Sequence, residues 1–208
     1  FRSLNYMTLP KGDTTQRGRG RGLFNGGRVG NTVQFINIQS QGNSIDFGDD
    51  TGAAETIEGF GLASSTRAVF GGGVSNNAKM EFVTIATTGN TASFGNLTVG
   101  RRSGCGMSNQ TRGVIAGGLA PSASDVMDFI TIATTGNATD FGDATTTFWN
   151  GLGGMSSPTR MVFGGGITPT VLNTLSYVEI LTTGNSVDFG DASTLGQRST
   201  SSNGHGGL

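Results

Sequence analysis

The sequence predicts an all-β protein built from one unit repeated four times. Three landmarks recur in step: a segment that opens with arginine and ends in glycine, an aromatic residue ahead of a Gly-Asn pair, and a Phe-Gly pair. Self-similarity at a fixed period of this kind is the sequence signature of a repeat architecture. No segment combines the 3.6-residue apolar period with the caps of a helix, so strands are expected throughout.

The repeats start near residues 21, 67, 112 and 160, which gives intervals of 46, 45 and 48 residues. The aromatic landmark has intervals of 47, 47 and 48, and it falls at Phe35, Phe82, Phe129 and Tyr177. We therefore assign residues 21–208 to one repeat domain. Residues 1–20 form a lead-in that fits the repeat badly and is a candidate for an added strand.

Each unit contains four expected strands, which we letter a to d in chain order. In the third unit they cover Arg102–Asn109, Arg112–Gly117, Phe129–Thr134 and Ala138–Gly142. The b segment is rich in β-branched residues, and the c segment alternates as a half-buried strand does. The Gly-Asn pair between c and d favours a hairpin turn, since both residues tolerate positive φ.

The two ends of the chain bear on how the sheets close. Residues 198–207 match strand a and are expected to complete the first unit, which has no well-matched a strand of its own. Closure of this kind leaves no open sheet edge. Two alternatives stay open, a partial fifth blade from the lead-in and a larger ring completed by another subunit.

Four-stranded units whose second strand ends in diglycine are the pattern of a β-propeller blade. The wording of the third unit, TRGVIAGG and then FITIATTGNATDFGD, resembles the kelch-like repeats of tailed marine bacteriophages, and so does the lead-in YMTLPKG. The resemblance covers almost the whole chain. It implies a non-enzymatic virion structural protein of the tail fibre, tail or capsid surface, with other virion proteins as partners. The chain departs from the pattern in having Phe where a kelch repeat has Trp on strand d, and in having only four units.

Composition argues against several other classes of protein. The net charge is −1 and 13% of residues are charged, which offers no general attraction to nucleic acid or to anionic membranes. No apolar run approaches the roughly 20 residues that span a bilayer. With a single cysteine, Cys105, and a single histidine, His205, the sequence suggests no disulfide, metal site, cofactor or catalytic triad. Because the chain begins at Phe1, we expect a processed product or part of a longer polypeptide.

Residues that recur in every unit are interpreted as scaffold. Asp-Phe-Gly-Asp occurs in three units, but the second unit has Ser93 and Asn96 in place of the aspartates. These aspartates are therefore expected to make turn and strand-end hydrogen bonds rather than to bind calcium. The four arginines that open the repeats are expected to make one common structural contact, and the diglycines to permit a close backbone approach.

Length varies in only some of the connections. The c aromatic and the d phenylalanine are 12 residues apart in every unit, whereas the distance from strand b to strand c is 11, 12, 14 and 14 residues. In an up-and-down sheet the b–c and d–a loops emerge on one face, where recognition by a repeat scaffold is expected. The candidate binding residues are Arg28, Asn76, Asn77, Lys79, Pro121, Ser122, Phe148, Trp149, Thr168 and Pro169.

Trp149 is the only tryptophan, and it suits stacking on a sugar or anchoring a protein contact. A structural plug between adjacent blades is the alternative. The resulting hypothesis is a virion protein that recognises a glycan or an envelope protein on the host surface. A purely structural protein that decorates a capsid or joins tail parts is one alternative. Self-association into a homo-oligomer is a separate option under either hypothesis. A glycan hydrolase that acts through carboxylates is the less favoured alternative.

Overall fold

The computed structural model describes residues 20–26, 30–51, 57–194, 196 and 200. Four antiparallel sheets follow one another along the chain, in an arrangement compatible with a β-propeller-like fold. The first sheet has three strands, β1 (Arg21–Phe24), β2 (Thr32–Asn37) and β3 (Ile45–Asp49). The second consists of β4 (Phe60–Ala63), β5 (Arg67–Gly71), β6 (Lys79–Thr84) and β7 (Ala92–Asn96).

The third and fourth sheets repeat this order and add short hairpins. The third contains β8 (Cys105–Ser108), β9 (Arg112–Ala116), β10 (Leu119–Ala120), β11 (Ser122–Thr131) and β12 (Thr139–Phe148). The fourth contains β13 (Gly153–Ser156), β14 (Arg160–Gly164), β17 (Thr174–Glu179) and β18 (Val187–Asp191), with β15 (Ile167–Thr168) and β16 (Thr170–Val171) as a separate hairpin. The described helical structure is one 3₁₀ turn, η2 (Val74–Asn76). No helix among the described residues is long and apolar enough to cross a membrane.

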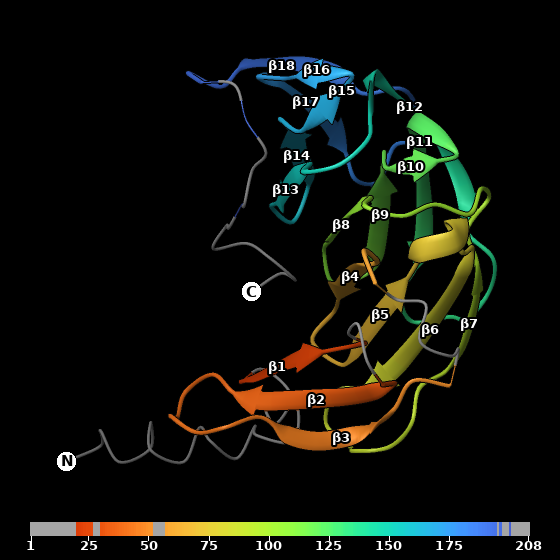
Figure 1. Ribbon diagram of the computed structural model, residues 1–208, viewed down its shortest axis with the longest axis vertical. Coiled ribbons are helices and arrows are strands. Elements are labelled where there is room, and N and C mark those ends of the chain that lie inside the picture. The colour runs from red at the N-terminus through yellow and green to blue at the C-terminus, as the bar shows by residue number, and fades with distance from the viewer. Residues whose placement is uncertain (1–19, 27–29, 52–56, 195, 197–199, 201–208) are drawn as a thin grey trace, which may run out of the picture.

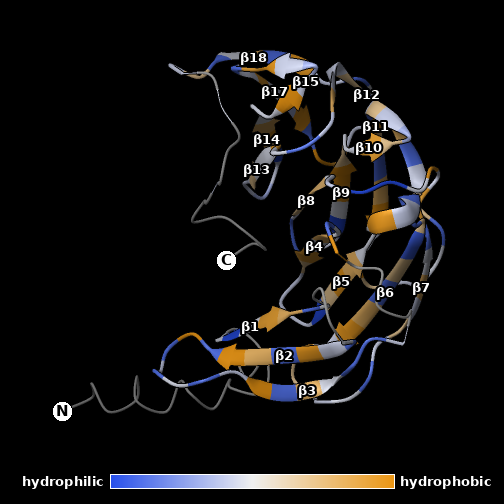
Figure 2. Ribbon diagram, in the orientation of Figure 1, coloured by the Kyte–Doolittle hydropathy of each residue, from blue (hydrophilic) through white to orange (hydrophobic). Residues whose placement is uncertain are grey.

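The four sheets are arranged along an arc, with the first and the fourth sheet at its two ends (Figure 1). Strand β8 contacts both β4 and β13, so the a strands of neighbouring sheets lie side by side. Hydrophobic residues concentrate in the strands and hydrophilic residues in the connecting loops (Figure 2). Because the sheets follow one another along the arc, each sheet has one face toward the next sheet and one toward the preceding sheet. We call these its outgoing face and its incoming face.

The hydrophobic core is divided into three clusters, one at each junction between neighbouring sheets. The first cluster joins Val33 and Phe47 of the first sheet to Val83 and Ile85 of the second. The second and third clusters repeat this plan, with Phe94 and Phe141 in the place of Phe47. The period-2 alternation of each strand supplies both faces, because successive side chains point to opposite sides of a sheet.

Each junction also carries the same backbone hydrogen bonds. The amide of the loop glycine donates to the carbonyl of the strand d phenylalanine in the preceding sheet, as from Gly136 to Phe94 at 2.7 Å. The neighbouring Asn137 accepts from the amide of Asn96 at 3.0 Å through its Oδ1. The same pair of bonds recurs at the other two junctions, made by Gly89, Asn90, Gly184 and Asn185.

The role of the Gly-Asn pair differs from the one predicted. Strands c and d do form the predicted hairpin in every unit. The pair does not use positive φ at its asparagine, because the described residues with positive φ other than glycine do not include Asn90, Asn137 or Asn185. The pair instead lies in a longer loop that reaches across to the preceding sheet. Its constancy in the sequence reflects docking between sheets.

The predicted common contact of the arginines is confirmed. All four lie over the strand c aromatic of their own sheet, at 4.2 to 4.7 Å from the ring centroid. The Nη1 atoms of the first three also donate to a backbone carbonyl of the next sheet, from Arg21 to Ile85, from Arg67 to Ile132 and from Arg112 to Ile180. These distances are 2.7 to 2.9 Å. Each of the three arginines thus connects two sheets.

The two remaining scaffold predictions are also confirmed. Asp46, Asp140 and Asp188 each accept a hydrogen bond from the amide two residues later, at 3.0 to 3.3 Å. At the diglycine, a Cβ placed on Gly118 would lie 2.5 Å from the carbonyl oxygen of Arg102. The glycine thus allows the b–c loop to approach the d–a loop.

Some strand bounds were predicted less well. In the third sheet β11 begins seven residues before the expected start at Phe129, and β12 extends beyond Gly142 to Phe148. The extension depends on register shifts in the ladder, after which Ser124 pairs with Phe148. The lead-in strand and the closing strand at 198–207 fall outside the described residues, except for Gly20 and Thr200.

Candidate recognition site

The b–c and d–a loops form one continuous surface, which we call the loop face. Leu119 and Arg102 exchange backbone hydrogen bonds of 2.8 and 3.1 Å between the two kinds of loop. In the fourth sheet the amide of Ile167 donates to Asn150 at 3.0 Å, and the amide of Trp149 donates to Ile167 at 2.9 Å. The loops of variable length are therefore supported by each other's backbones.

Two of these loops have the same local structure. In the third unit Leu119 pairs with Ala123, which leaves Pro121 at the tip of a very tight hairpin. In the fourth unit Ile167 pairs with Val171 around Pro169. Proline fixes φ near −65° and lacks an amide donor, so it is well suited to a tip whose amide has no ladder partner. Both loops present a proline ring at a fixed place.

The loop face contains a pocket of about 330 Å³, which is at the small end of the range of ligand-binding pockets. Trp149 forms part of its wall and is 46% exposed. The other lining residues are Leu119, Pro121, Ser122, Ala123, Thr168 and Pro169. The wall is mainly apolar, with two side-chain hydroxyl groups.

Neighbouring residues of β12 hold the tryptophan in place. Phe148 is fully buried and packs edge-to-face on Phe163 with ring centroids 6.0 Å apart. The hydroxyls of Thr147 and Thr168 lie 2.8 Å apart, which connects β12 to the second proline hairpin. Because adjacent residues of a strand point in opposite directions, burial of Phe148 turns Trp149 outward.

Half of the predicted binding residues line this pocket, namely Pro121, Ser122, Trp149, Thr168 and Pro169. The assignment of Phe148 as a binding residue is wrong, because its side chain has no exposed surface. Leu119 and Ala123 were missed, since small and aliphatic residues in a short loop carry no recognisable signal. Arg28 lies outside the described residues.

Asn76, Asn77 and Lys79 belong to the second unit's loop and do not line the pocket. Asn77 has a local structural role, since its Oδ1 accepts from the amide of Lys79 at 3.0 Å and its carbonyl from Arg101 at 3.3 Å. Lys79 is exposed at the start of β6. These three residues thus belong to the loop face but lie outside the pocket around Trp149.

The pocket wall offers apolar surface and hydroxyl groups. None of its lining side chains titrates near neutral pH, so the wall itself offers no general acid or base. Among the described residues no three His, Cys, Asp or Glu side chains gather as a metal site. An exposed indole beside hydroxyl groups can stack on an apolar ring face and hydrogen-bond at its edge.

No protein-family model matches the sequence, and no curated protein matches it either. Among solved structures the fold is similar to that of YjhT, with a TM-score of 0.66 and 8% sequence identity. The similarity covers 85% of this chain and 64% of the YjhT chain, so the protein spans less than two thirds of that structure's length. At this identity the likeness concerns the fold alone.

Proposed function

We propose that the chain is a non-enzymatic recognition domain of a tailed-phage virion, folded as a kelch-like β-propeller of four repeats. Its loop face binds a glycan on the host surface. The observation that carries the proposal is the 330 Å³ pocket, where loops of variable length bring Trp149, Pro121 and Pro169 together. The phage assignment rests on the resemblance of the repeat units, and the fold agrees with the likeness to YjhT.

The pocket suits a carbohydrate better than an apolar ligand. A sugar presents one apolar face for the indole and hydroxyl groups at its rim for Ser122 and Thr168. The site is open on the surface rather than enclosed, as expected for an internal or terminal residue of a long polysaccharide. The absence of ionisable lining side chains favours binding over hydrolysis.

The pocket is also held rigidly before a ligand arrives. The two hairpins are tipped by Pro121 and Pro169, and Trp149 is fixed by its backbone bond to Ile167 and by its buried neighbour Phe148. A site that needs no reordering loses less entropy on binding. Rigid walls of this kind are typical of recognition sites placed on a scaffold.

The test is binding of the purified protein to a panel of bacterial surface oligosaccharides and to host cells. Trp149→Ala should weaken binding at least tenfold, which corresponds to about 1.4 kcal/mol, whereas Trp149→Phe should retain part of the affinity. Leu181→Ala is the matched control, because Leu181 is 67% exposed in the c–d loop on the opposite side. Undiminished binding by Trp149→Ala would contradict the proposal.

A structural role in capsid decoration or tail joining is the second candidate. The observation in its favour is a pair of exposed apolar residues, Ile38 directly after β2 and Phe189 in β18. These strands belong to the two sheets at the ends of the arc (Figure 1). This role predicts that the protein is retained in particles but does not bind cells. A glycan hydrolase would instead release shorter oligosaccharides from the bound polysaccharide.

A further inference from the structure

The two ends of the arc each carry one unoccupied half of the junction that recurs inside the molecule. Strand d phenylalanines are 3%, 3% and 2% exposed at Phe47, Phe94 and Phe141, where a following sheet covers them. Phe189, in the same position of the last sheet, is 53% exposed. The outgoing face of the fourth sheet thus has the composition of a buried surface, but no sheet among the described residues covers it.

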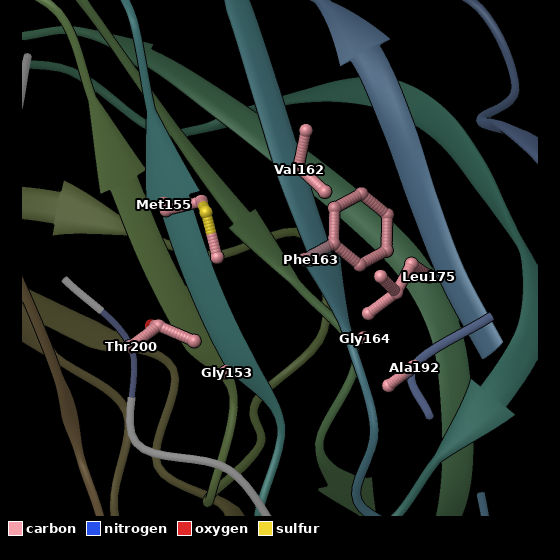
Figure 3. Close-up of a pocket in the computed structure, with 8 residues that line it drawn as sticks. All are labelled: Gly153, Met155, Val162, Phe163, Gly164, Leu175, Ala192 and Thr200. Atoms are coloured by element: carbon pink, nitrogen blue, oxygen red, sulfur yellow. The ribbon is translucent and has the colours of Figure 1, made fainter. Parts of the chain in front are cut away.

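This outgoing face contains an apolar pocket of 250 Å³ (Figure 3). Its wall includes Met155, Val162 and Leu175. Ala192 and Thr200 also line it. The corresponding residues of the third sheet are completely buried against the fourth sheet, at Met107, Val114 and Met127. The pocket is therefore the place that a following sheet would fill.

The incoming face of the first sheet carries the residues that would fill such a pocket. Ile38 is 65% exposed, whereas its counterparts Ile85, Ile132 and Ile180 are 6%, 1% and 0% exposed. Phe24 is 55% exposed and occupies the position of Phe163, which is buried between the third and fourth sheets. This face also resembles an internal junction from which one partner has been removed.

The polar groups at the two ends match as well. At each internal junction the Nη1 atom of the repeat arginine donates to the carbonyl of an isoleucine in the next sheet. The equivalent donor of the fourth sheet is Arg160, and the equivalent acceptor of the first sheet is the carbonyl of Ile38. The amide of the loop glycine also donates to the carbonyl of the strand d phenylalanine in the preceding sheet. The equivalent donor of the first sheet is Gly42, and the equivalent acceptor of the fourth sheet is Phe189. Within the part of the chain that the structure describes, neither of these two bonds has formed.

The glycine of the Phe-Gly pair gives an independent sign of the missing neighbour. A Cβ on Gly142 would lie 2.5 Å from the backbone of Gly184 in the next sheet. A Cβ on Gly190 would meet no atom within 4 Å. The space beside Gly190 is thus open at the place where the Gly-Asn loop of a following sheet would lie.

We propose that these two faces bind each other between copies of the chain, head to tail, so that the fourth sheet of one copy meets the first sheet of the next. A second copy is the occupant that the geometry favours, because each end is complementary to the opposite end of the same chain in apolar shape, donors and acceptors. The first and the fourth sheet lie at opposite limits of the arc (Figure 1). Contact between unlike faces generates a ring if it closes and a filament if it does not.

The test uses the full 208-residue chain in sedimentation experiments over a wide range of concentrations. The wild-type protein should shift from the mass of one chain toward two and more as concentration rises. Phe189→Glu and Ile38→Glu each block a different face, so each variant alone should remain a single chain. An equimolar mixture of the two should form a 1:1 dimer and nothing larger, since one intact face of each kind remains.

Val187→Lys is the matched control, because Val187 is 53% exposed and its counterparts Ala92 and Thr139 stay exposed at internal junctions. This variant should assemble as the wild type does. Circular dichroism confirms that all variants are folded, and Arg160→Ala provides a second, milder block of the outgoing face.

A wild-type chain that keeps the mass of one chain at every concentration overturns the proposal, and that is the result expected if other parts of the same polypeptide cover the two faces. Assembly that survives both blocking variants, or a mixture that forms no dimer, overturns it equally.

Discussion

The guanidinium of Arg101 and the carboxylate of Asp128 lie 2.9 Å apart, and both side chains are buried, with 1% and 0% exposure. Arg101 comes from the loop between the second and third sheets, and Asp128 from β11. The hydroxyl of Thr98 donates to the same carboxylate at 2.5 Å, and Arg101 Nη2 donates to the carbonyl of Ile115 at 3.1 Å. Burial lowers the pKa of Arg101, and the charge of Asp128 opposes this effect. The pair holds the loop between the second and third sheets against the third sheet, at a place without solvent.

Removing one partner of this pair should be strongly destabilising. Asp128→Ala leaves the Arg101 charge buried without a counter-ion, and we expect the free energy of unfolding to fall by about 3–5 kcal/mol. Urea denaturation measures the loss. The control is Glu179→Ala, which breaks the exposed 2.6 Å pair with Arg160 and should cost less than about 1 kcal/mol. A similarly small loss of unfolding free energy in both variants would show that water or another group solvates the Arg101 charge once Asp128 is removed.

Glu81 should make stability depend on pH. Its pKa is raised above the ordinary value of 4.5, mainly by burial and then by a hydrogen bond with Asp50, while Thr91 and Thr51 act in the opposite direction. The folded state therefore keeps this proton to a higher pH than the unfolded state does. The resulting stabilisation is complete below pH 4.5 and is lost as the pH rises through the folded-state pKa.

Glu81→Gln removes this titration and keeps an acceptor for the threonine hydroxyls. The melting temperature of the variant relative to the wild type should increase between pH 4 and pH 7, by a few degrees. Thermal unfolding of both proteins across this range provides the measurement. Parallel melting curves at all pH values would mean that Glu81 titrates normally.

The glycines of the Phe-Gly pairs allow a test with a matched control inside one chain. Gly142 and Gly190 both have positive φ, at 135° and 123°, so alanine at either position is strained to a similar degree. Only at Gly142 would the added Cβ also collide with the next sheet. We expect Gly142→Ala to cost roughly 2 kcal/mol more than Gly190→Ala in dilute solution. Equal losses of unfolding free energy in the two variants would show that the positive φ alone, and not the neighbouring sheet, requires glycine at these positions.

Cys105 is half-buried, packed against the third core cluster, and its thiol should react slowly in the folded protein. Burial raises the pKa of its thiol to about 12, so the reactive thiolate is scarce at pH 8. Alkylation at pH 8 should be at least tenfold slower in buffer than in denaturing urea, because the unfolded thiol has its ordinary pKa near 9. Labelling at the same rate in both solutions would contradict the burial of this sulfur.

The periodic part of the structure could be predicted from sequence because each contact is made several times. Arg67, Arg112 and the aspartates before Phe-Gly were assigned to scaffold on their spacing, and they make the expected contacts. The Gly-Asn pair was recognised as constant, but its partner in the neighbouring sheet could not be seen within one unit. The Arg101–Asp128 pair occurs once, so no repeat marked it.

The candidate site was predictable only in part, for a geometric reason. The variable loops indicated Pro121, Trp149 and Pro169, which the structure brings to one pocket. Whether Phe148 or Trp149 faces outward depends on the parity of a strand that continues six residues beyond Gly142. A shift of register by one residue would have reversed their roles. Sequence alone does not determine that register.

The division of the core into three separate clusters has a consequence for how the molecule opens. Each sheet is stabilised chiefly by its neighbours, as in nearest-neighbour descriptions of repeat proteins. Counted over the described residues alone, the clusters contain five, ten and eleven buried residues from the first junction to the third. The N-terminal sheet is therefore held least strongly, and its amide hydrogens should exchange with solvent before those of β9 and β14. Local opening begins at β1–β3, which allows this sheet to detach while the other three keep their packing.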